Sequence, residues 1–398
     1  MALKFCPETA LDYARAMARP RLAGTDEEKA VGDELARRLE GFGYRVEKEP
    51  FRFWMAVIIA INLEILGGMI LAGLALMGFV PYFVSALGLI VLLAVSNAIN
   101  NAAESVAILP DTEAESLLAR LVRRLGLDHA AYNLVANLPG EADAPPEKRL
   151  YLVAHYDTKS QPLPILVRIL LFVVLFAGSA GFIAFGLLGS VFSVFGPLAF
   201  VFGVLLIAAG LPLILNGYGN KSPGAIDNAS GVGVVLHLAE LLAREPSLRP
   251  RLDWTILLTS AEELTLMGAA AYVMRHLAEL RDRAHESAVH ILNFDGVGVK
   301  GRLFYDARGQ MLRGALAPLT EDAAKTLGIS VKQTRLVGAL LDHIPFARRG
   351  FDALSLLAIG RASWTVHTTS DTVDRLHPTG FDQAGKLAAE IIRRLTDA

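Results

Sequence analysis

Two adjacent carboxylates, Glu262 and Glu263, follow an apolar run that ends in Thr259-Ser260-Ala261. The run predicts a buried strand, and the residues from Leu264 to about His276 predict a helix after it. Neighbouring side chains diverge on an extended or turning backbone, so we expect the two acids to have different roles. One carboxylate could bind a metal ion while the other moves a proton. A surface Glu-Glu pair that opens a helix is the simpler alternative, because acids suit the first turn.

Four further clusters of acidic or imidazole side chains lie at or just after predicted strand ends. They are His155-Tyr156-Asp157, Asp227-Asn228, Asp295 and His367. In α/β sheets, ligands bind in the crevice at the carboxyl ends of the strands. Two histidines and three carboxylates form a suitable ligand set for two zinc ions that share a bridging carboxylate. The sequence therefore indicates a candidate two-zinc site.

Each of these residues also has a structural alternative. His155 or His367 alone is compatible with an ordinary hydrogen-bonded histidine, and Asp157 is compatible with a salt-bridge partner. Asp227 could cap the helix that follows it, and Asp295 could belong to an Asp-Gly turn. Taken one at a time, these alternatives are favoured, so the decision depends on how the clusters are combined.

Six short segments, in this order along the chain, resemble the motifs of the di-zinc aminopeptidase family. That family includes bacterial leucyl aminopeptidases, glutamate carboxypeptidase II and glutaminyl cyclase. The segments are Ala154-His155-Tyr156-Asp157, Pro223-Gly224-Ala225-Ile226-Asp227-Asn228-Ala229-Ser230-Gly231, Ala261-Glu262-Glu263 with Gly268, Asn293-Phe294-Asp295, Asp342-His343-Ile344-Pro345-Phe346 and Val366-His367-Thr368-Thr369-Ser370-Asp371-Thr372. Each segment is short, but the ordered set is specific, and it favours a metal site over the structural alternatives.

The resemblance implies a metal-binding role for five positions. His155 and Asp295 would bind one zinc ion, and Glu263 and His367 would bind the other. Asp227 would bridge the two ions, because a carboxylate has two oxygens. The implied cofactor is therefore a pair of zinc ions per chain.

The resemblance also implies roles for four residues around the metals. Glu262 would be the general base, which takes a proton from water and later passes one to the leaving amine. Asp157 would accept a hydrogen bond from the far nitrogen of His155 and fix its tautomer. Asp342 and His343 match a segment that lines the substrate side of such a site.

The sequence departs from the family pattern in two places. Leu264-Thr265-Leu266-Met267 replaces a small, glycine-containing segment, and we expect it to reshape the pocket wall. A long apolar insertion separates Asp157 from Asp227. We expect this insertion to lie near the mouth of the site, which would then accept hydrophobic or membrane-derived peptides.

The elements that must position these residues alternate between helices and strands. Helices are predicted at 8–19, 25–40, 111–125, 316–327 and 380–396, and strands at 44–51, 132–138, 150–155, 289–295, 303–306 and 352–359. Thr25 followed by Glu28 is a capping-box pattern at the start of the second helix. The alternation predicts an α/β fold layered by helices, and the resemblance implies a mixed central β-sheet flanked by helices.

Two pairs of long apolar segments interrupt this pattern, in a chain of 398 residues that is 53% hydrophobic. About 20 apolar residues span a bilayer as a helix, so each pair predicts a transmembrane hairpin. A buried soluble hairpin is the alternative. The predicted division is 1–53, 100–164 and 216–398 for the peptidase-like domain, with hairpins at 54–99 and 165–215.

The charges predict how the chain is placed. Because both hairpins leave the soluble part and return to it, both of its faces must lie on one side of the membrane. The hairpin turns lack Lys and Arg, whereas the flanks carry Arg45, Lys48, Arg52, Arg168 and Lys221. The positive-inside rule then predicts a cytoplasmic domain; an outward-facing domain would require the N-terminal segment to be translocated. The net charge of -2 gives no reason to expect nucleic-acid binding, and Cys6 alone excludes an intrachain disulfide.

The expected function is that of an integral membrane zinc metallopeptidase with about four transmembrane helices. We expect an aminopeptidase that hydrolyses the N-terminal peptide bond of a peptide substrate. A carboxypeptidase or amidohydrolase on the same scaffold, and a non-catalytic membrane scaffold or receptor, are the alternatives. The preferred side chain and the oligomeric state are left open.

Overall fold

The computed structural model describes residues 3–101, 107–109, 117–139, 146–309, 314–336 and 339–397. The chain divides into two compact units. Unit 1 comprises Met1–Phe53, Leu109–Ser160 and Gly219–Ala398, and unit 2 comprises Trp54–Ile108 and Gln161–Tyr218. The first residues of the predicted helix 111–125, up to residue 116, lie outside the described residues.

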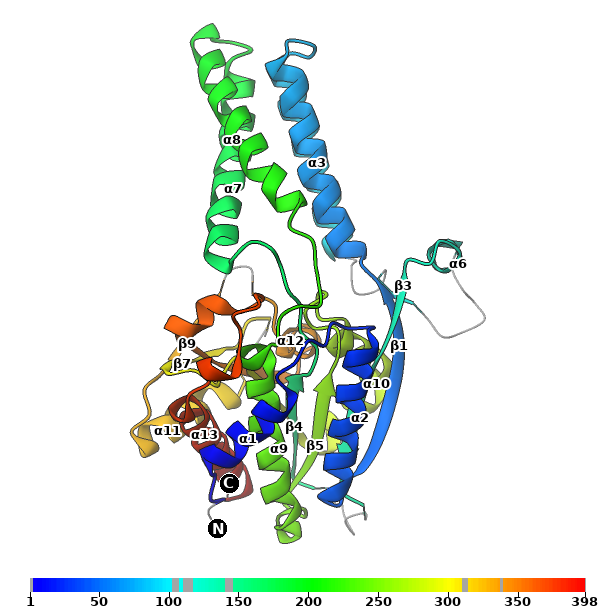
Figure 1. Cartoon of the computed structure of the whole chain (residues 1–398), viewed down its shortest axis with the longest axis vertical. Coiled ribbons are helices and arrows are strands. Elements are labelled where there is room, and N and C mark those ends of the chain that lie inside the picture. The colour runs from blue at the N-terminus through cyan, green and yellow to red at the C-terminus, as the bar shows by residue number, and fades with distance from the viewer. Residues whose placement is uncertain are drawn as a thin grey trace. The chain divides into compact units, whose positions relative to one another are not determined.

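A nine-stranded sheet runs through the described residues in the order β2-β1-β3-β5-β4-β6-β9-β7-β8, and Figure 1 shows several of its strands, among them β4 and β5. The strands are β1 (Arg45–Trp54), β2 (Ile108–Leu109), β3 (Asp128–Asn137), β4 (Lys148–His155), β5 (Leu252–Thr259), β6 (Ala288–Asp295), β7 (Gly301–Asp306), β8 (Val331–Gln333) and β9 (Asp352–Gly360). Strands β5, β4, β6 and β9 are parallel to one another, whereas β3 and β7 are antiparallel to their neighbours β5 and β9. The expected α/β fold with a mixed sheet is confirmed.

The central strands are apolar on both faces because helices cover both. In β4, Leu152 packs in a cluster with residues of α1, α2, α9, α11 and α13, whereas its neighbour Val153 packs with residues of α10 and α12. Successive side chains of a strand point to opposite faces, so the two groups of helices lie on opposite faces of the sheet. The helices are α1 (Pro7–Met17), α2 (Asp26–Gly41), α6 (Leu117–Arg124), α9 (Ser230–Ala243), α10 (Met267–Glu286), α11 (Leu316–Leu327), α12 (His343–Ala347) and α13 (Pro378–Asp397).

The start of α2 shows the predicted cap in an altered form. The hydroxyl of Thr25 accepts a hydrogen bond from the backbone N–H of Glu28, 3.3 Å away. The Glu28 carboxylate accepts instead from Gly24 N–H at 3.0 Å and from the Ser260 hydroxyl at 2.6 Å. The cap therefore also ties α2 to the end of β5.

Unit 2 consists of two pairs of long apolar helices. They are α3 (Ala56–Leu76), α4 (Tyr82–Asn101), α7 (Ile165–Leu188) and α8 (Gly196–Ile214), with a short 3₁₀ turn η1 (Ser193–Phe195) before α8. Gly178 on α7 allows close packing, since a Cβ there would lie 2.8 Å from the backbone nitrogen of Leu206 on α8. Ser96 on α4 donates a hydrogen bond to Glu64 on α3, so this acid has a partner within the helical unit.

Four helices among the described residues are long and apolar enough to cross a membrane. Three belong to unit 2, namely α3, α7 and the segment Ser193–Ile214, and each is at most 33% buried. The fourth, Ala225–Ala243, is 83% buried and lies in the core of unit 1, so its apolar character is explained by the sheet. The apolar part of α4, Tyr82–Ala98, is shorter.

Candidate metal centre

The candidate site forms where the parallel strands end. His155 is the last residue of β4 and Asp295 the last residue of β6. Glu262 and Glu263 follow the end of β5, after Ala261 with a φ of 55°. His367 follows β9 and the 3₁₀ turn η4 (Arg361–Thr365). Parallel neighbours end at the same edge of the sheet, which is why these distant residues meet.

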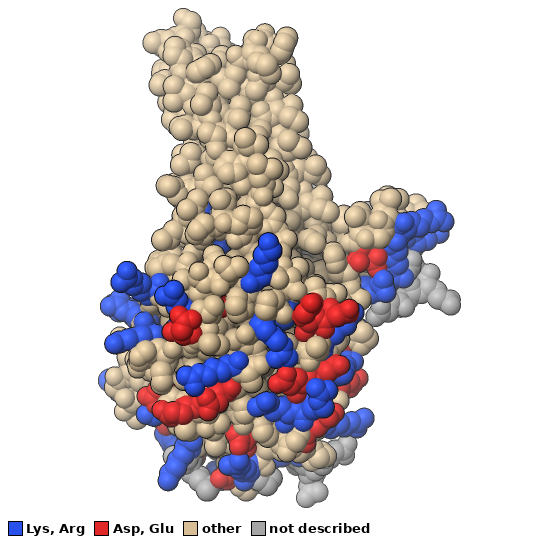
Figure 2. Space-filling view, viewed as in Figure 1, with Lys and Arg blue, Asp and Glu red and all other residues tan. Residues whose placement is uncertain are grey.

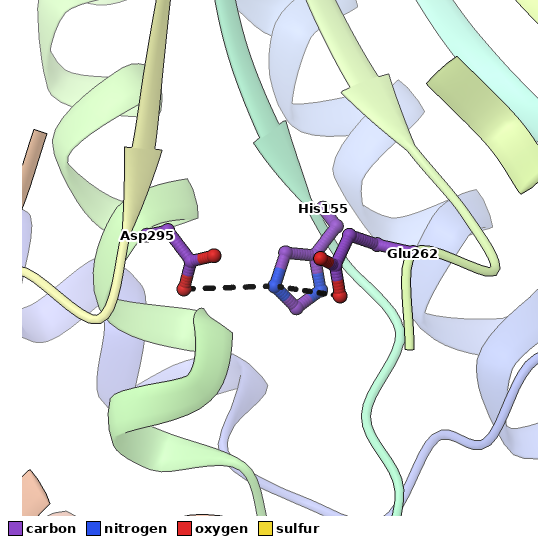
Figure 3. Close-up of side chains that lie close together, drawn as sticks. All are labelled: His155, Glu262 and Asp295. Atoms are coloured by element: carbon purple, nitrogen blue, oxygen red, sulfur yellow. Dashed lines mark ion pairs between the residues drawn. The ribbon is translucent and has the colours of Figure 1, made fainter. Parts of the chain in front are cut away.

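The first group consists of His155, Glu262 and Asp295 (Figure 3). Nε2 of His155 lies 3.8 Å from Oε2 of Glu262 and 3.9 Å from Oδ1 of Asp295. The histidine is 1% exposed, so the two carboxylates approach a buried imidazole.

The second group consists of Asp227, Glu263 and His367. Nε2 of His367 lies 2.9 Å from Oδ2 of Asp227 and 3.0 Å from Oε2 of Glu263. Lys159, which follows β4, places its Nζ 3.0 Å from the same Glu263 oxygen. The sequence offered no reason to single out Lys159.

Asp227 joins the two groups. Its Oδ2 faces His367, and its Oδ1 lies 3.2 Å from Nε2 of His155. It belongs to the short helical turn η2 (Ala225–Ala229), which leads into α9. One carboxylate thus presents one oxygen to each histidine, which is the arrangement a bridging ligand requires.

Two buried carboxylates outside these groups hold the backbone of the site residues. Asp157 accepts hydrogen bonds from the N–H groups of Glu262 at 3.2 Å and of Glu263 at 3.3 Å. Asp371 accepts in the same way from Ile226 at 2.7 Å and Asp227 at 3.2 Å. Each carboxylate therefore fixes two adjacent residues of a loop that carries candidate ligands.

Asp157 was expected to orient His155 as well. The nearest group to Nδ1 of His155 is the backbone carbonyl oxygen of Asp157 at 3.3 Å, and the carboxylate Oδ1 lies at 3.5 Å. In the sequence, Asp371 stands out only as part of a motif. Its role depends on a contact between residues 144 or 145 positions apart, which spacing along the chain does not indicate.

Arg21 and Asn228 brace the same loops. The guanidinium of Arg21 is completely buried, and it donates to the carbonyl oxygens of Met17, Arg19, Tyr156, Pro223 and Gly224. Burial lowers the Arg21 pKa to about 10, so it stays charged at neutral pH. Asn228 donates to the carbonyl of Phe294 at 2.8 Å and so ties the Asp227 loop to the end of β6.

The charges of the site are unbalanced. Burial raises the pKa of Glu262 well above its ordinary range. The neighbouring carboxylates raise this pKa further, whereas His155 lowers it. Burial also raises the pKa of Asp295. Burial acts on Asp227 in the same sense, but the nearby His155 and His367 imidazoles hold its pKa well below the ordinary range. Four carboxylates thus crowd two histidines and one lysine.

The segment expected on the substrate side is buried. Asp342 and His343 are both 0% exposed. Oδ2 of Asp342 accepts a hydrogen bond from the Thr259 hydroxyl, while among the described residues no group hydrogen-bonds to Oδ1. His343 has partners on both ring nitrogens, the Ser355 hydroxyl at 2.7 Å and the Arg308 carbonyl at 3.2 Å. Burial lowers the His343 pKa to about 3, so this ring is neutral.

The donor set fits zinc. Histidine nitrogens and carboxylate oxygens are zinc ligands, and the three ligand atoms of each group lie within 4.8 Å of one another. Nε2 of His155 is buried without a well-directed hydrogen bond from any described residue. Divalent cations would neutralise the carboxylates and give this nitrogen a partner.

Fold and site together define an α/β protein with two adjacent histidine–carboxylate centres that share an aspartate. The sequence model of peptidase family M28 matches residues 133–392. That match covers more than half of the chain, and the chain belongs to this family. The family expected from the sequence is thereby confirmed.

Known relatives agree with this assignment. Aminopeptidase YwaD of Bacillus subtilis (strain 168) is 30% identical over 179 residues, a match that covers 43% of this chain and only 37% of that protein. A zinc aminopeptidase from Bacillus subtilis has a similar structure, with a TM-score of 0.59 and 16% identity over 99% of this chain and 96% of its own.

Two more solved structures share the fold. An aminopeptidase from Aneurinibacillus sp. strain AM-1 has a TM-score of 0.56 and 15% identity, over 98% of this chain and 93% of its own. Bacteroides thetaiotaomicron glutaminyl cyclase has a TM-score of 0.53 and 17% identity, over 98% of this chain and 99% of its own. At these identities the likeness concerns the fold.

Proposed function

We propose that this chain is a membrane-anchored zinc metallopeptidase that removes residues from the N-terminus of peptides. The observation that carries the proposal is the position of Asp227, whose two oxygens face His155 and His367 in separate groups. The names of the relatives, aminopeptidase YwaD and two further aminopeptidases, favour the N-terminal direction.

The proposed ligands are the five expected from the sequence. His155 and Asp295 would hold one zinc ion, Glu263 and His367 would hold the other, and Asp227 would be shared by both. When bound, zinc supplies Lewis acidity, which polarises a carbonyl and lowers the pKa of water. Asp157 and Asp371 keep the loops of these ligands in place through the backbone.

Glu262 is the proposed general base. Its raised pKa suits a carboxylate that accepts a proton and later gives it up. In the proposed reaction it takes a proton from the attacking water and passes one to the leaving amine nitrogen. Asp342 is the proposed substrate-side residue, because its Oδ1 accepts no hydrogen bond from the described residues. His343 is proposed to support that side by its fixed position.

The helices of unit 2 are the proposed membrane anchor. Many of their apolar side chains are exposed, for example Leu63 at 59%, Ile70 at 53%, Val91 at 62% and Leu170 at 62%. Exposed apolar surface on this scale is explained by a lipid environment. We propose that the hairpins return unit 1 to the cytoplasmic side, following the positive flanks. We also propose hydrophobic or membrane-derived peptides as substrates, because the second apolar pair interrupts the peptidase sequence.

Peptide hydrolysis by the detergent-purified full chain tests the proposal. The panel contains peptides with free and blocked N- and C-termini, both short soluble and hydrophobic, and zinc is measured in parallel. Cleavage that requires a free N-terminus, with about two zinc ions per chain, supports the proposal. Cleavage of N-blocked substrates alone would replace it with a carboxypeptidase or amidohydrolase. Metal-free protein without turnover would point to a scaffold.

Whether unit 2 crosses a membrane is tested separately. Alkaline carbonate releases peripheral proteins from membranes but not spanning ones, so the full chain is expected to stay in the pellet. Recovery in the supernatant would overturn the anchor while leaving the peptidase proposal in place.

A further inference from the structure

Helix α6 exposes a row of leucines. The side chains of Leu117, Leu121, Leu125 and Leu127 are 79%, 53%, 61% and 43% exposed. The four-residue spacing of the first three places them on one side of the helix. The helix is held from its other side, where Ala119 and Val122 are 2% exposed. A short helix with this much exposed leucine has an apolar face without a cover in the described part of the chain.

Basic residues flank this row. Arg120 and Arg124 are exposed, and the sequence from 117 to 127 contains no acidic residue. The nearest acids in the sequence on either side are Glu115, two residues before Leu117, and Asp128; Asp128 is bound by Arg52, whose Nε lies 2.8 Å from its carboxylate. Figure 2 shows Lys and Arg side chains beside uncharged surface over α6. We call the four leucines together with Arg120 and Arg124 the α6 patch.

The end of α6 is built to present the patch. Gly126 adopts a φ of +62°, and its N–H donates to the carbonyl of Arg123 at 3.0 Å. The N–H of Leu127 reaches back to the carbonyl of Val122 at 3.1 Å. This pattern ends a helix with a defined reversal, so the helix stops before the chain continues into β3.

An ion pair ties the residue that follows the patch to β1, the strand that precedes the first apolar helix in the chain. Asp128 lies three residues beyond Leu125, a distance of at most about 10 Å. Its partner Arg52 lies four residues before Ala56, the first residue of α3, a length of chain of at most about 14 Å. The patch is therefore linked, through one ion pair, to the stretch of chain that leads into a candidate membrane helix.

We propose that the α6 patch lies in the headgroup layer of an anionic membrane, with its leucines against the acyl chains and Arg120 and Arg124 on lipid phosphates. Short helices with apolar and basic sides bind such surfaces, and their affinity has an electrostatic part. Long basic side chains can extend from an apolar side to the phosphates. The proposal rests on the membrane anchor proposed above.

Quenching by brominated lipids tests it in the full chain. The background is Cys6→Ser, which removes the sole cysteine, and a fluorophore is attached at Leu121→Cys. Leu66→Cys on α3, 42% exposed, reports insertion of unit 2, and Leu327→Cys on α11, 39% exposed, reports a surface of unit 1 away from the patch. Each protein is placed in lipid nanodiscs that contain acyl-brominated lipid, with or without phosphatidylglycerol.

The expected result is quenching at 66 and 121 but not at 327, with phosphatidylglycerol strengthening the quenching at 121. Arg120→Glu with Arg124→Glu should lower the equilibrium constant for docking of the patch on the membrane by about 30-fold or more. The label at 121 should then lose its quenching, while the label at 66 stays quenched. The charge-matched pair Arg37→Glu and Arg281→Glu, both exposed, should change nothing.

The controls separate the two proposals. Quenching at 66 without quenching at 121 overturns the α6 inference and leaves the anchor intact. No quenching at either position overturns both. An unquenched label at 121, together with disulfide crosslinks between unlabelled Leu121→Cys chains in detergent, would assign the patch to a second copy of the chain instead.

Discussion

Glu262 is the residue on which the proposed chemistry depends. Glu262→Gln removes the proton acceptor but keeps the size of the side chain and leaves the five proposed ligands unchanged. General-base catalysis contributes about 10²–10⁴ to a rate, so kcat should fall by about that factor with zinc content unchanged. Glu40→Gln, at an exposed position on α2, is the matched control and should keep full activity. Undiminished turnover in the Glu262→Gln variant would exclude Glu262 as the base.

Asp371 is not one of the proposed metal ligands. Its two carboxylate oxygens accept hydrogen bonds from the backbone N–H groups of Ile226 and Asp227. Asp371→Asn leaves one oxygen and presents an N–H₂ group to a backbone N–H. Residues that orient metal ligands typically contribute about 10–100-fold to metal affinity. We expect a zinc affinity lower by that factor in competition with a chromophoric chelator.

Asp374→Asn is the control for this change, since Asp374 lies three residues on and is 70% exposed. It should bind zinc as the parent does. Equal affinities of all three proteins would show that Asp371 has no part in holding the Asp227 loop.

The proposed ligands were accessible from the sequence because most of them lie at or after strands that the apolar pattern predicts. His155 and Asp295 end apolar runs, and Glu262 follows one. The residues that brace them were not accessible. Arg21 binds carbonyl oxygens, and a carbonyl oxygen occurs in every residue, so no pattern of residue types marks its partners.

At the scale of elements, the joint between α2 and β5 rests on one buried carboxylate. Glu28 is 0% exposed, and burial raises its pKa to about 7 from an ordinary 4.5. The folded state thus binds this proton more tightly than the unfolded state does. The Glu28 contribution to the free energy of unfolding is therefore greatest at low pH and falls as the pH rises from about 4.5 through about 7.

Glu28→Gln should remove this dependence. The full pKa difference corresponds to about 3 kcal/mol, so the variant should gain stability relative to the parent between pH 5 and pH 8. Thermal unfolding of both proteins at the two pH values, with excess zinc, gives the difference. Glu27→Gln, at the exposed neighbouring position, should parallel the parent. Parallel behaviour of the Glu28→Gln variant would refute the assignment.

Element boundaries show where sequence patterns stop being informative. The helix expected from Leu264 begins at Met267, because Thr265 and Leu266 have φ values of 83° and 64°. Leu266 packs with Leu341 and Leu357, so a tertiary contact accompanies a backbone conformation that its own propensity disfavours. The short strand β8 (Val331–Gln333) and helix α12 (His343–Ala347) also lacked a periodic signal.

At the scale of the molecule, the two units of the chain differ in their content of charged residues. Unit 1 carries a buried excess of carboxylates, whereas the helices of unit 2 hold few charges, as the uncharged surface in Figure 2 shows. The two apolar pairs interrupt the sequence of unit 1, but the class of fold could still be predicted. Each pair begins and ends in a connection between two strands of the sheet, so no strand is divided. Alternation along the chain could predict the class of fold, but strand order depends on pairings across those insertions.

Removal of metal should therefore act on one unit only. Without cations, Glu262, Glu263, Asp227 and Asp295 repel one another in a buried space, and the loops that carry them should open. A metal present at about 1,000 times its Kd stabilises the folded state by about 4 kcal/mol, so a chelator should remove stability of that order from unit 1.

Hydrogen exchange of the full chain in nanodiscs, with and without 1,10-phenanthroline, measures this by segment. Faster exchange is expected at residues 225–229 and 260–267, reversed by added zinc, with α3 and α7 unchanged. Unchanged exchange at the loops would mean that the four carboxylates do not depend on metal, and faster exchange in α3 and α7 as well would mean that the two units unfold together.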